Sequence, residues 1–176
     1  MVVLLPKNLS CRPAGREYIE RLRYLLVFQF GRGADKVLDM LDIDKLGVCF
    51  SKTTQRPRAL IYGGEILAAI RASDFYLVLH MPLGKLLHRV LPYPLRRVAV
   101  VSEMVDDILE EGHTVFAKHV IEADESIRPF EEVLVVDESD RLIGVGRALL
   151  DYETMVTATY GPAVQLREKE VLGGLP

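Results

Sequence analysis

GHTVFAKHVIEAD (112–124), RPFEEVLVVDE (128–138) and SDRLIGVGRALL (139–150) are the three segments that decide the fold of this 176-residue chain. Each holds an apolar run rich in Val, Ile, Leu or Phe, and polar residues separate the runs, which is a pattern typical of consecutive β-strands. Pro129 marks the first turn, and the polar segment 138–141 suits the tip of a hairpin. The segments therefore predict three consecutive strands in the second half of the chain.

Two glycines, Gly144 and Gly146, lie inside the third run. Glycine weakens a strand, so its presence there marks either a bulge or the close approach of another backbone. A tight bend in a small barrel and a contact with a ligand both fit this pattern, and at the level of sequence both readings stay open.

The first half of the chain mixes helical and strand patterns. Segments with apolar residues at helical spacing are 16–30, 33–41 and 82–91. Segments that predict strands are 46–51, 59–64, 65–72 and 75–81. Residues 1–15 show no clear period and predict an irregular lead-in, in which the opening MVVLLP suits a first strand or a partner-facing arm.

The formal net charge of −3 conceals an asymmetry between the two halves. Residues 1–101 hold 16 Lys and Arg against 8 Asp and Glu, and residues 102–176 hold 6 against 17, so the balances are +8 and −11. A basic half attracts nucleic acid, while an acidic half faces solvent or a basic partner. The same asymmetry also fits attraction between the two halves across a domain interface.

The chain carries no recognisable catalytic or metal-binding motif. None of the four histidines belongs to an HExxH pair or a spaced Cys/His set. We therefore predict no catalytic residue, no metal and no cofactor. Cys11 and Cys49 are too few for a disulfide framework or a Cys-rich zinc site, so we expect buried or free thiols in a reducing cytoplasm. No run approaches the roughly 18–20 apolar residues that cross a bilayer, so we expect no membrane partner.

A strip without acidic residues over 82–101 is the strongest nucleic-acid signal from the residues alone. Its cations, which we predict to contact phosphates, are Lys85, Arg89, Arg96 and Arg97. Lys85 and Arg89 are four residues apart on one helix face, and such a strip neutralises phosphates. The alternative is a solvated helix face that meets the acidic helix predicted after it over SEMVDDILEE (102–111). A second basic patch consists of Lys52, Arg56 and Arg58.

VFAKHVIEAD (115–124), EEVLVVDESDRLIGVGRALL (131–150) and GPAVQLRE (161–168) resemble a PUA domain, the small β-barrel found on RNA-modifying enzymes. With FQFGRGA (28–34), IRASDFYLVL (70–79) and LPYPLRRVAVV (91–101), the chain resembles the C-terminal part of archaeal tRNA-guanine transglycosylase, the archaeosine enzyme. The resemblance covers about 28–169. Phe130 stands where a glycine is common before the EVLVV strand, and the catalytic barrel of that family is absent from this sequence.

The resemblance implies an RNA site, because in that family RNA docks where the first helix and the strand after it meet the glycine-containing strand. The residues carried over are Gly112, Val115, Phe116, Ala117, Lys118, His119, Gly144, Gly146, Arg147 and Ala148. Small residues in this set would admit a ribose–phosphate chain, and Lys118 and Arg147 would supply charge. The implied target is the 3′ end and acceptor stem of tRNA.

We predict a two-domain, cytoplasmic α+β protein. A mixed accessory (pre-PUA) domain occupies 1–91, a linker 92–94, a PUA-like β-barrel 95–170 and a loose tail 171–176. The predicted function is non-catalytic binding of structured RNA such as tRNA, in support of a separate catalytic chain of a tRNA-modifying system. The alternative is a protein-interaction module that keeps the fold without binding RNA, and the acidic second half favours it.

Overall fold

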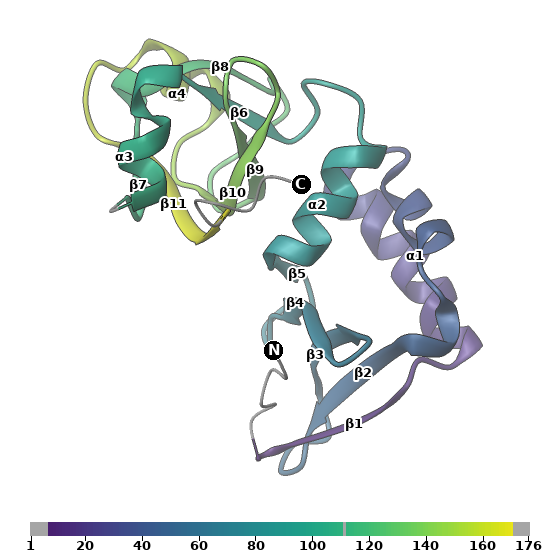
Figure 1. Ribbon diagram of the computed structural model, residues 1–176. Helices are drawn as coiled ribbons and strands as arrows, with labels where there is room; N and C mark the ends of the chain where they lie inside the picture. Colours follow the sequence, from purple (N-terminus) through teal and green to yellow (C-terminus); the bar gives the residue numbers. More distant parts are fainter. Residues whose placement is uncertain (1–6, 111, 171–176) are drawn as a thin grey trace. The chain divides into compact units, whose positions relative to one another are not determined.

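The computed structural model describes residues 7–110 and 112–170 (Figure 1). Contacts divide the chain into two compact units, of which the first ends at Leu91 and the second begins at Pro92. Each unit combines helices with a sheet, so the predicted α+β class is confirmed. The opening 1–6, expected as a strand or arm, and the tail 171–176, expected to be loose, lie outside the described residues.

The first unit is a five-stranded antiparallel sheet whose strands follow chain order. The strands are β1 (Leu9–Pro13), β2 (Leu46–Ser51), β3 (Pro57–Tyr62), β4 (Glu65–Ile70) and β5 (Leu77–Leu79). The helices are α1 (Arg16–Phe30), the 3-10 helices η1 (Ala34–Met40) and η2 (Ile43–Lys45), and α2 (Met81–Val90). On α1 the buried residues Leu22, Leu26 and Phe30 recur every four positions. That spacing gives one apolar face, which is why the sequence located this helix.

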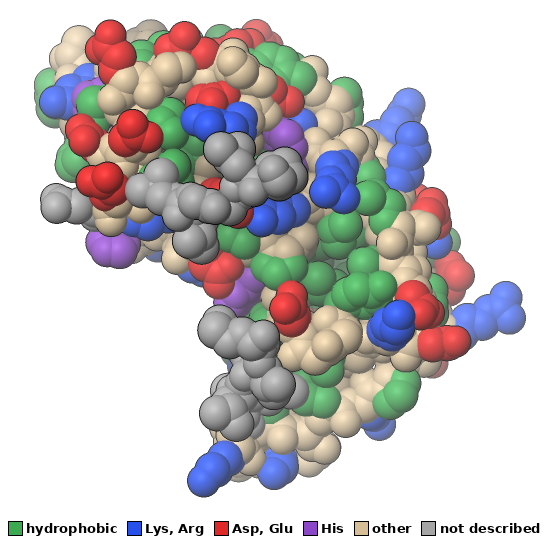
Figure 2. Space-filling model, viewed as in Figure 1, with side chains coloured by type: hydrophobic (Ala, Val, Ile, Leu, Met, Phe, Trp, Pro, Cys, Tyr) green, Lys and Arg blue, Asp and Glu red, His purple; other side chains and the backbone are tan. Residues whose placement is uncertain are grey.

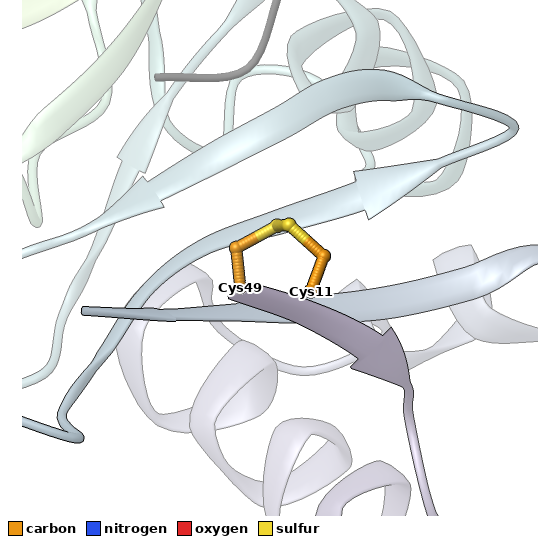
Figure 3. The surroundings of a disulfide bond; sticks show 2 residues. All are labelled: Cys11 and Cys49. Atoms are coloured by element: carbon orange, nitrogen blue, oxygen red, sulfur yellow. A yellow bond between two sulfur atoms is a disulfide. The ribbon is translucent and has the colours of Figure 1, made fainter. Parts of the chain in front are cut away.

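The expectation for the cysteines is wrong, because Cys11 and Cys49 form a disulfide (Figure 3). The two residues are direct partners in the pairing of β1 with β2. The lead-in therefore contains an edge strand, which the sequence did not reveal because β1 is mostly exposed and lacks an alternating apolar pattern. A disulfide that joins residues 38 apart lowers the entropy of the unfolded chain, which contributes about 4 kcal/mol of stability.

The second unit is built on a curled six-stranded sheet in the order β7-β11-β10-β9-β6-β8. The strands are β6 (Arg97–Val100), β7 (Thr114–Phe116), β8 (Val120–Ala123), β9 (Glu132–Val136), β10 (Leu142–Ala148) and β11 (Pro162–Lys169). The helices are η3 (Ser102–Met104), α3 (Val105–Glu110), η4 (Ala117–His119) and α4 (Tyr152–Thr157). Its core contains Val98, Val133, Val135, Ile143 and Met155, all fully or almost fully buried. The hairpin predicted at 138–141 is present, since β9 and β10 pair antiparallel across it.

The first of the three apolar runs is not a single strand. It forms β7 and β8, which lie at opposite edges of the sheet, with η4 between them. The turn of η4 carries the chain from one edge to the other, and the curl of the sheet makes this passage short (Figure 1). Lys118 consequently lies on η4, whereas the sequence had predicted it on a strand.

Gly144 and Gly146 are explained by the backbone of the neighbouring strand β11. A Cβ atom at Gly144 would lie 2.6 Å from the carbonyl oxygen of Glu168, and one at Gly146 would overlap the carbonyl oxygen of Gln165. The register also shifts between Val145 and Gly146, as it does at a β-bulge. Both glycines are buried against β11, so the expectation that they admit a ribose–phosphate chain is wrong.

Candidate nucleic-acid interface

A cleft of about 480 Å³ opens between α3 and β7 in the second unit. Gly112 makes the junction of the two elements, because its N–H donates to the carbonyl oxygens of Asp107 and Ile108 at 3.1 and 3.2 Å. A Cβ atom there would lie 2.8 Å from Ile108 Cα. The glycine is thus required for the close turn from helix to strand, and it is a lining residue as well. The full lining is Met104, Asp107, Ile108, Glu110, Gly112, Thr114, Val115, Phe116 and His119.

The surface of the cleft combines an aromatic ring, an imidazole and two carboxylates. Phe116 is 46% exposed. Lys118, two residues further along the chain on η4, is exposed but does not line the cleft. Burial lowers the pKa of His119, the charge of Lys118 lowers it further, and Asp107 acts in the opposite direction. The imidazole is therefore neutral at neutral pH and offers one donor and one acceptor nitrogen.

Arg147 lies on β10 and does not line the cleft, because β11 separates β10 from β7. Arg147 pairs directly with Gln165 on β11, which pairs directly with Thr114 on β7. Direct partners place their side chains on the same face of a sheet. A row of three residues therefore leads from Arg147 to Thr114 at the edge of the cleft, and Arg147 Nη2 donates to Gln165 Oε1 at 3.0 Å.

Phe130 has a backbone conformation that glycine adopts more readily than other residues. Its φ is 72°, in the left-handed region, which costs a non-glycine residue about 1–2 kcal/mol. Its N–H donates to the Ala148 carbonyl oxygen at 2.8 Å, and its side chain is 60% exposed. The guanidinium carbon of Arg147 lies 5.6 Å from the centre of the ring. The substitution thus places an aromatic platform beside Arg147 on the surface.

The ten residues carried over from the resemblance divide into a surface group and a core group. Val115, Ala117, Gly144, Gly146 and Ala148 are buried and build the domain. Phe116 and Lys118 are exposed, and Gly112, His119 and Arg147 are half-buried. Only the surface group is available to RNA, and its role as an RNA contact stays a prediction.

Arg96 and Arg97 are not surface cations, and this part of the predicted strip is wrong. Arg97 is 2% exposed, and its Nε donates to Asp140 Oδ1 at 2.6 Å. Arg96 is 9% exposed, and its Nη1 donates to Glu131 Oε2 at 2.6 Å. Both guanidinium groups are committed to carboxylates of the second unit, so neither is available for phosphates.

The other predicted cations are on the surface of the first unit. Lys85 and Arg89 are exposed on α2, whose inward face holds Leu83 and Leu87. Lys52 and Arg56 are exposed around the turn from β2 to β3, and Arg58 is half-buried in β3. These residues stay candidates for phosphate contacts.

Sequence reasoning missed several residues of the interface. Asp107 and Glu110 are three apart on α3, and this spacing puts them on one face, but it gave no sign that the face borders a cleft. Thr114 and Gln165 had no signal at all, since only strand pairing brings them together. Phe130 had been singled out solely as a departure from a glycine.

No group of three or more potential metal ligands occurs among residues 7–110 and 112–170. Within the same described ranges no helix is long and apolar enough to span a bilayer.

Comparison with known proteins assigns both units. Residues 96–169 match the family model of the PUA domain. The second unit is a PUA domain. Residues 20–94 match the model of the patch-forming domain C2 of tRNA-guanine transglycosylase. The two matches confirm the resemblance seen in the sequence, with a C2 domain before the PUA domain.

The relatives are archaeal. The chain is 37% identical over 163 residues to a tRNA-guanine(15) transglycosylase of Pyrococcus abyssi. The matched region covers 93% of this chain and 26% of the relative. The chain is 39% identical over 151 residues to the corresponding protein of Methanocaldococcus jannaschii, covering 84% of this chain and 22% of the relative. The chain thus spans about a quarter of the length of these relatives.

Solved structures share the fold over most of the chain. A hypothetical protein of the hyperthermophile Pyrococcus horikoshii superimposes with a TM-score of 0.65 at 23% identity, covering 91% of this chain and 94% of that one. A PUA-domain protein of Thermoplasma acidophilum gives 0.61 at 19% identity, with coverages of 91% and 93%. At these identities the comparison shows that the fold is shared.

Proposed function

We propose that this chain is a non-catalytic RNA-binding protein whose PUA domain holds the single-stranded 3′ end of a structured RNA such as tRNA. The observation that carries the proposal is the cleft between α3 and β7, which the exposed Phe116 lines, with Lys118 exposed two residues further along the chain in the same PUA domain. An aromatic ring beside a cation suits an unstacked nucleotide, because a base stacks on the ring while the cation meets a phosphate.

The acidic wall of the cleft favours particular bases and excludes phosphates. Asp107 and Glu110 carry carboxylates, which accept hydrogen bonds from exocyclic amino groups such as those of cytosine and adenine. Uracil has no such group. A phosphate inside the cleft would be repelled by the same carboxylates. The arrangement therefore fits bases turned inward and a backbone kept outside, near Lys118.

The row from Arg147 to Thr114 provides a path for the backbone that leads to the cleft. Direct cross-strand partners are roughly 5 Å apart at Cβ, so the row extends about 10 Å. Phe130 lies beside Arg147 at one end, and Phe116 borders the cleft at the other. Two aromatic platforms joined by a polar row suit a short single-stranded segment.

The relatives give the proposal its biological setting. By name they are tRNA-guanine(15) transglycosylases, and we propose that this chain supports tRNA modification in the cytoplasm together with a separate catalytic chain. The proposal assigns no catalytic step to the chain itself. The disulfide does not oppose this location, because intracellular proteins of hyperthermophilic archaea are rich in disulfides.

The test is the binding of labelled tRNA with and without its CCA end, measured by fluorescence anisotropy. We expect Lys118→Gln to weaken binding of the complete tRNA roughly fivefold, and to lower the log–log salt slope by roughly 0.7–1. The matched control is Arg141→Gln, which removes the same charge from an exposed residue that is paired with Asp137 at 3.0 Å. Equal affinities of the Lys118 and Arg141 variants for complete tRNA would overturn the site.

The second candidate function is a protein-interaction module, which the charge of the PUA domain favours. Residues 92–176 hold 8 Lys and Arg against 17 Asp and Glu, a balance of −9. If the parent protein fails to bind tRNA even at low salt, where phosphate contacts are strongest, this candidate replaces RNA binding.

A further inference from the structure

The first unit has a face without acidic residues that the PUA site does not include. Residues 7–16 and 46–64, which contain β1, β2, β3 and the turns beside them, hold no Asp or Glu. They hold six cations, which are Lys7, Arg12, Arg16, Lys52, Arg56 and Arg58. Within the described part of the chain, none of the six has an ion-pair partner. We call this surface the basic face.

The strands of the basic face are neighbours in the sheet, so the cations on β1, on β3 and on the turn between β2 and β3 belong to one sheet. β1 pairs with β2 and β2 with β3. Figure 2 shows Lys and Arg side chains without acidic neighbours at the lower end of the first unit, where Figure 1 places the turn between β2 and β3. Edge strands carry cations to prevent pairing with other sheets. That explanation covers only β1, because Lys52, Arg56 and Arg58 belong to the interior strands and their turn.

An apolar cleft of about 680 Å³ adjoins the basic face. Leu22 and Leu25 of α1 form one wall, and Val48, Phe50 and Pro57 of the sheet form the other. The guanidinium carbon of Arg12 lies 4.4 Å from the centre of the Phe50 ring, at the border between cleft and face. The lining acid, Glu17, is paired with Arg21 on α1 and brings no net charge to the cleft.

The disulfide fixes the relation between Arg12 and Phe50. Cys11 and Cys49 are direct partners, and their neighbours Arg12 and Phe50 point to the opposite face of the sheet. A slip of β1 by one residue would move Arg12 to the wrong face. The covalent bond prevents such a slip and holds the cation over the ring.

We propose that the basic face and its cleft form a second RNA-binding surface, which takes a single-stranded segment without reading a 3′ end. Phosphates meet Lys52, Arg56 and Arg58, and an unstacked base enters the cleft beside Phe50. Cations along a groove with an aromatic platform are the means by which proteins bind single strands independently of sequence. This inference extends the proposed function, but it rests on residues of the first unit alone.

The test uses the full chain, a labelled twelve-nucleotide oligouridine without a CCA end, and tRNA. We expect Arg56→Glu to weaken oligouridine binding roughly five- to tenfold and to lower the salt slope by about 1. The matched control, Lys36→Glu, makes the same charge reversal at an exposed residue of η1, away from the three strands. We expect Lys36→Glu to change the affinity less than about twofold.

A second pair of variants tests the cleft. Phe50→Leu keeps the apolar bulk but removes the ring, and we expect it to weaken oligouridine binding at least roughly fivefold, whereas Phe50→Tyr keeps the parent affinity. Equal effects of Arg56→Glu and Lys36→Glu would overturn the second surface. Polyglutamate that competes as well as polyuridine at equal charge would also overturn it, in favour of an acidic protein partner.

The outcomes separate this inference from the PUA site. If Arg56→Glu is silent while Lys118→Gln weakens tRNA binding, the PUA site stands and the second surface fails. If the reverse is found, the second surface stands and the proposed 3′-end site fails.

Discussion

Lys85 and Arg89 on α2 can be compared with Arg96 and Arg97 at the start of β6, since all four belong to one acid-free stretch of sequence. The first two are exposed on the first unit, and the last two are buried in the second. The acids that pair with Arg96 and Arg97 are Glu131 and Asp140, far along the chain. An acid-free stretch of sequence therefore does not establish a basic surface, because acids far along the chain can pair with its cations, as they do with Arg96 and Arg97.

The buried residues Arg96 and Arg97 also hold the start of the PUA domain in place through hydrogen bonds. Arg97 Nη1 donates to the carbonyl oxygens of Leu95 at 3.0 Å and Pro92 at 3.4 Å. The backbone N–H of Arg96, whose φ is 63°, donates to Asp124 at 2.7 Å. Tyr93 donates to Glu122 at 2.6 Å. This hydrogen bond, together with desolvation and the charges of Glu122 and Asp140, raises the pKa of Tyr93 to about 12. Arg96 and Arg97 thus stabilise the folded domain, whereas the sequence had predicted that they contact RNA phosphates.

The largest expected effect separates the two groups by stability. Arg97→Leu leaves Asp140 and two carbonyl groups without their donor, so we expect the free energy of unfolding of the PUA domain to fall by about 2–3 kcal/mol. Arg89→Leu, at an exposed position, should change it by less than about 0.5 kcal/mol. Urea denaturation followed by circular dichroism measures both. Similar losses for the two variants would remove the distinction between them.

A second expected effect concerns the linker predicted at 92–94. Because Arg97 and Glu122 hold this segment, we expect limited proteolysis to cut slowly within 91–95 in the parent and at least roughly threefold faster in Arg97→Leu. Each cut should leave two folded pieces, which mass spectrometry and circular dichroism identify. A chain that is first cut elsewhere, or whose pieces unfold, would contradict the predicted domain boundary.

The comparison of exposed and buried arginines also predicts different effects of their substitution on RNA affinity. We expect Arg89→Glu to weaken binding to all RNAs alike, roughly threefold, and to lower the salt slope by about 1. Arg96→Gln should leave the affinity for RNA within about twofold of the parent, provided that the variant remains folded. The side chain of Arg96 is buried and does not contact RNA, and the effect of a distant charge is screened by salt. Anisotropy titrations at several salt concentrations decide, and a stronger effect at Arg96 would reverse the assignment.

The smallest expected effect is a dependence on pH. The folded domain lowers the pKa of His119, so folding favours the neutral imidazole. The free energy of unfolding is therefore at its full value above pH 6.5, the ordinary pKa of histidine, and it decreases as the pH falls through the lower pKa of the folded state. Nuclear magnetic resonance titration should show a midpoint below that of a free histidine. His119→Gln should remove the corresponding slope from the stability profile between pH 5 and 7, roughly the titration range of histidine. A midpoint at or above 6.5 would contradict the structure.

The predictable part of the interface was the part carried by local pattern. Helix α1 and the hairpin of β9 and β10 follow from apolar spacing and turn residues, and the PUA resemblance located Phe116 and Lys118. Half of the site residues that the resemblance implied are buried in the core. A motif does not show which of its small residues pack against another strand. Gly146 shows this, since its place is set by the backbone of Gln165.

The sequence by itself determined the α+β class, most elements and the resemblance to a PUA domain and to the C-terminal part of archaeal tRNA-guanine transglycosylase, because periodicity and motifs are properties of neighbouring residues. Tertiary structure alone decided the disulfide of Cys11 with Cys49, the burial of Arg96 and Arg97, and the row from Arg147 to Thr114. Each of these depends on strand register or on ion pairs between residues far apart in the chain. Pairing across such distances is fixed by the packing of the whole domain, and no local pattern encodes it.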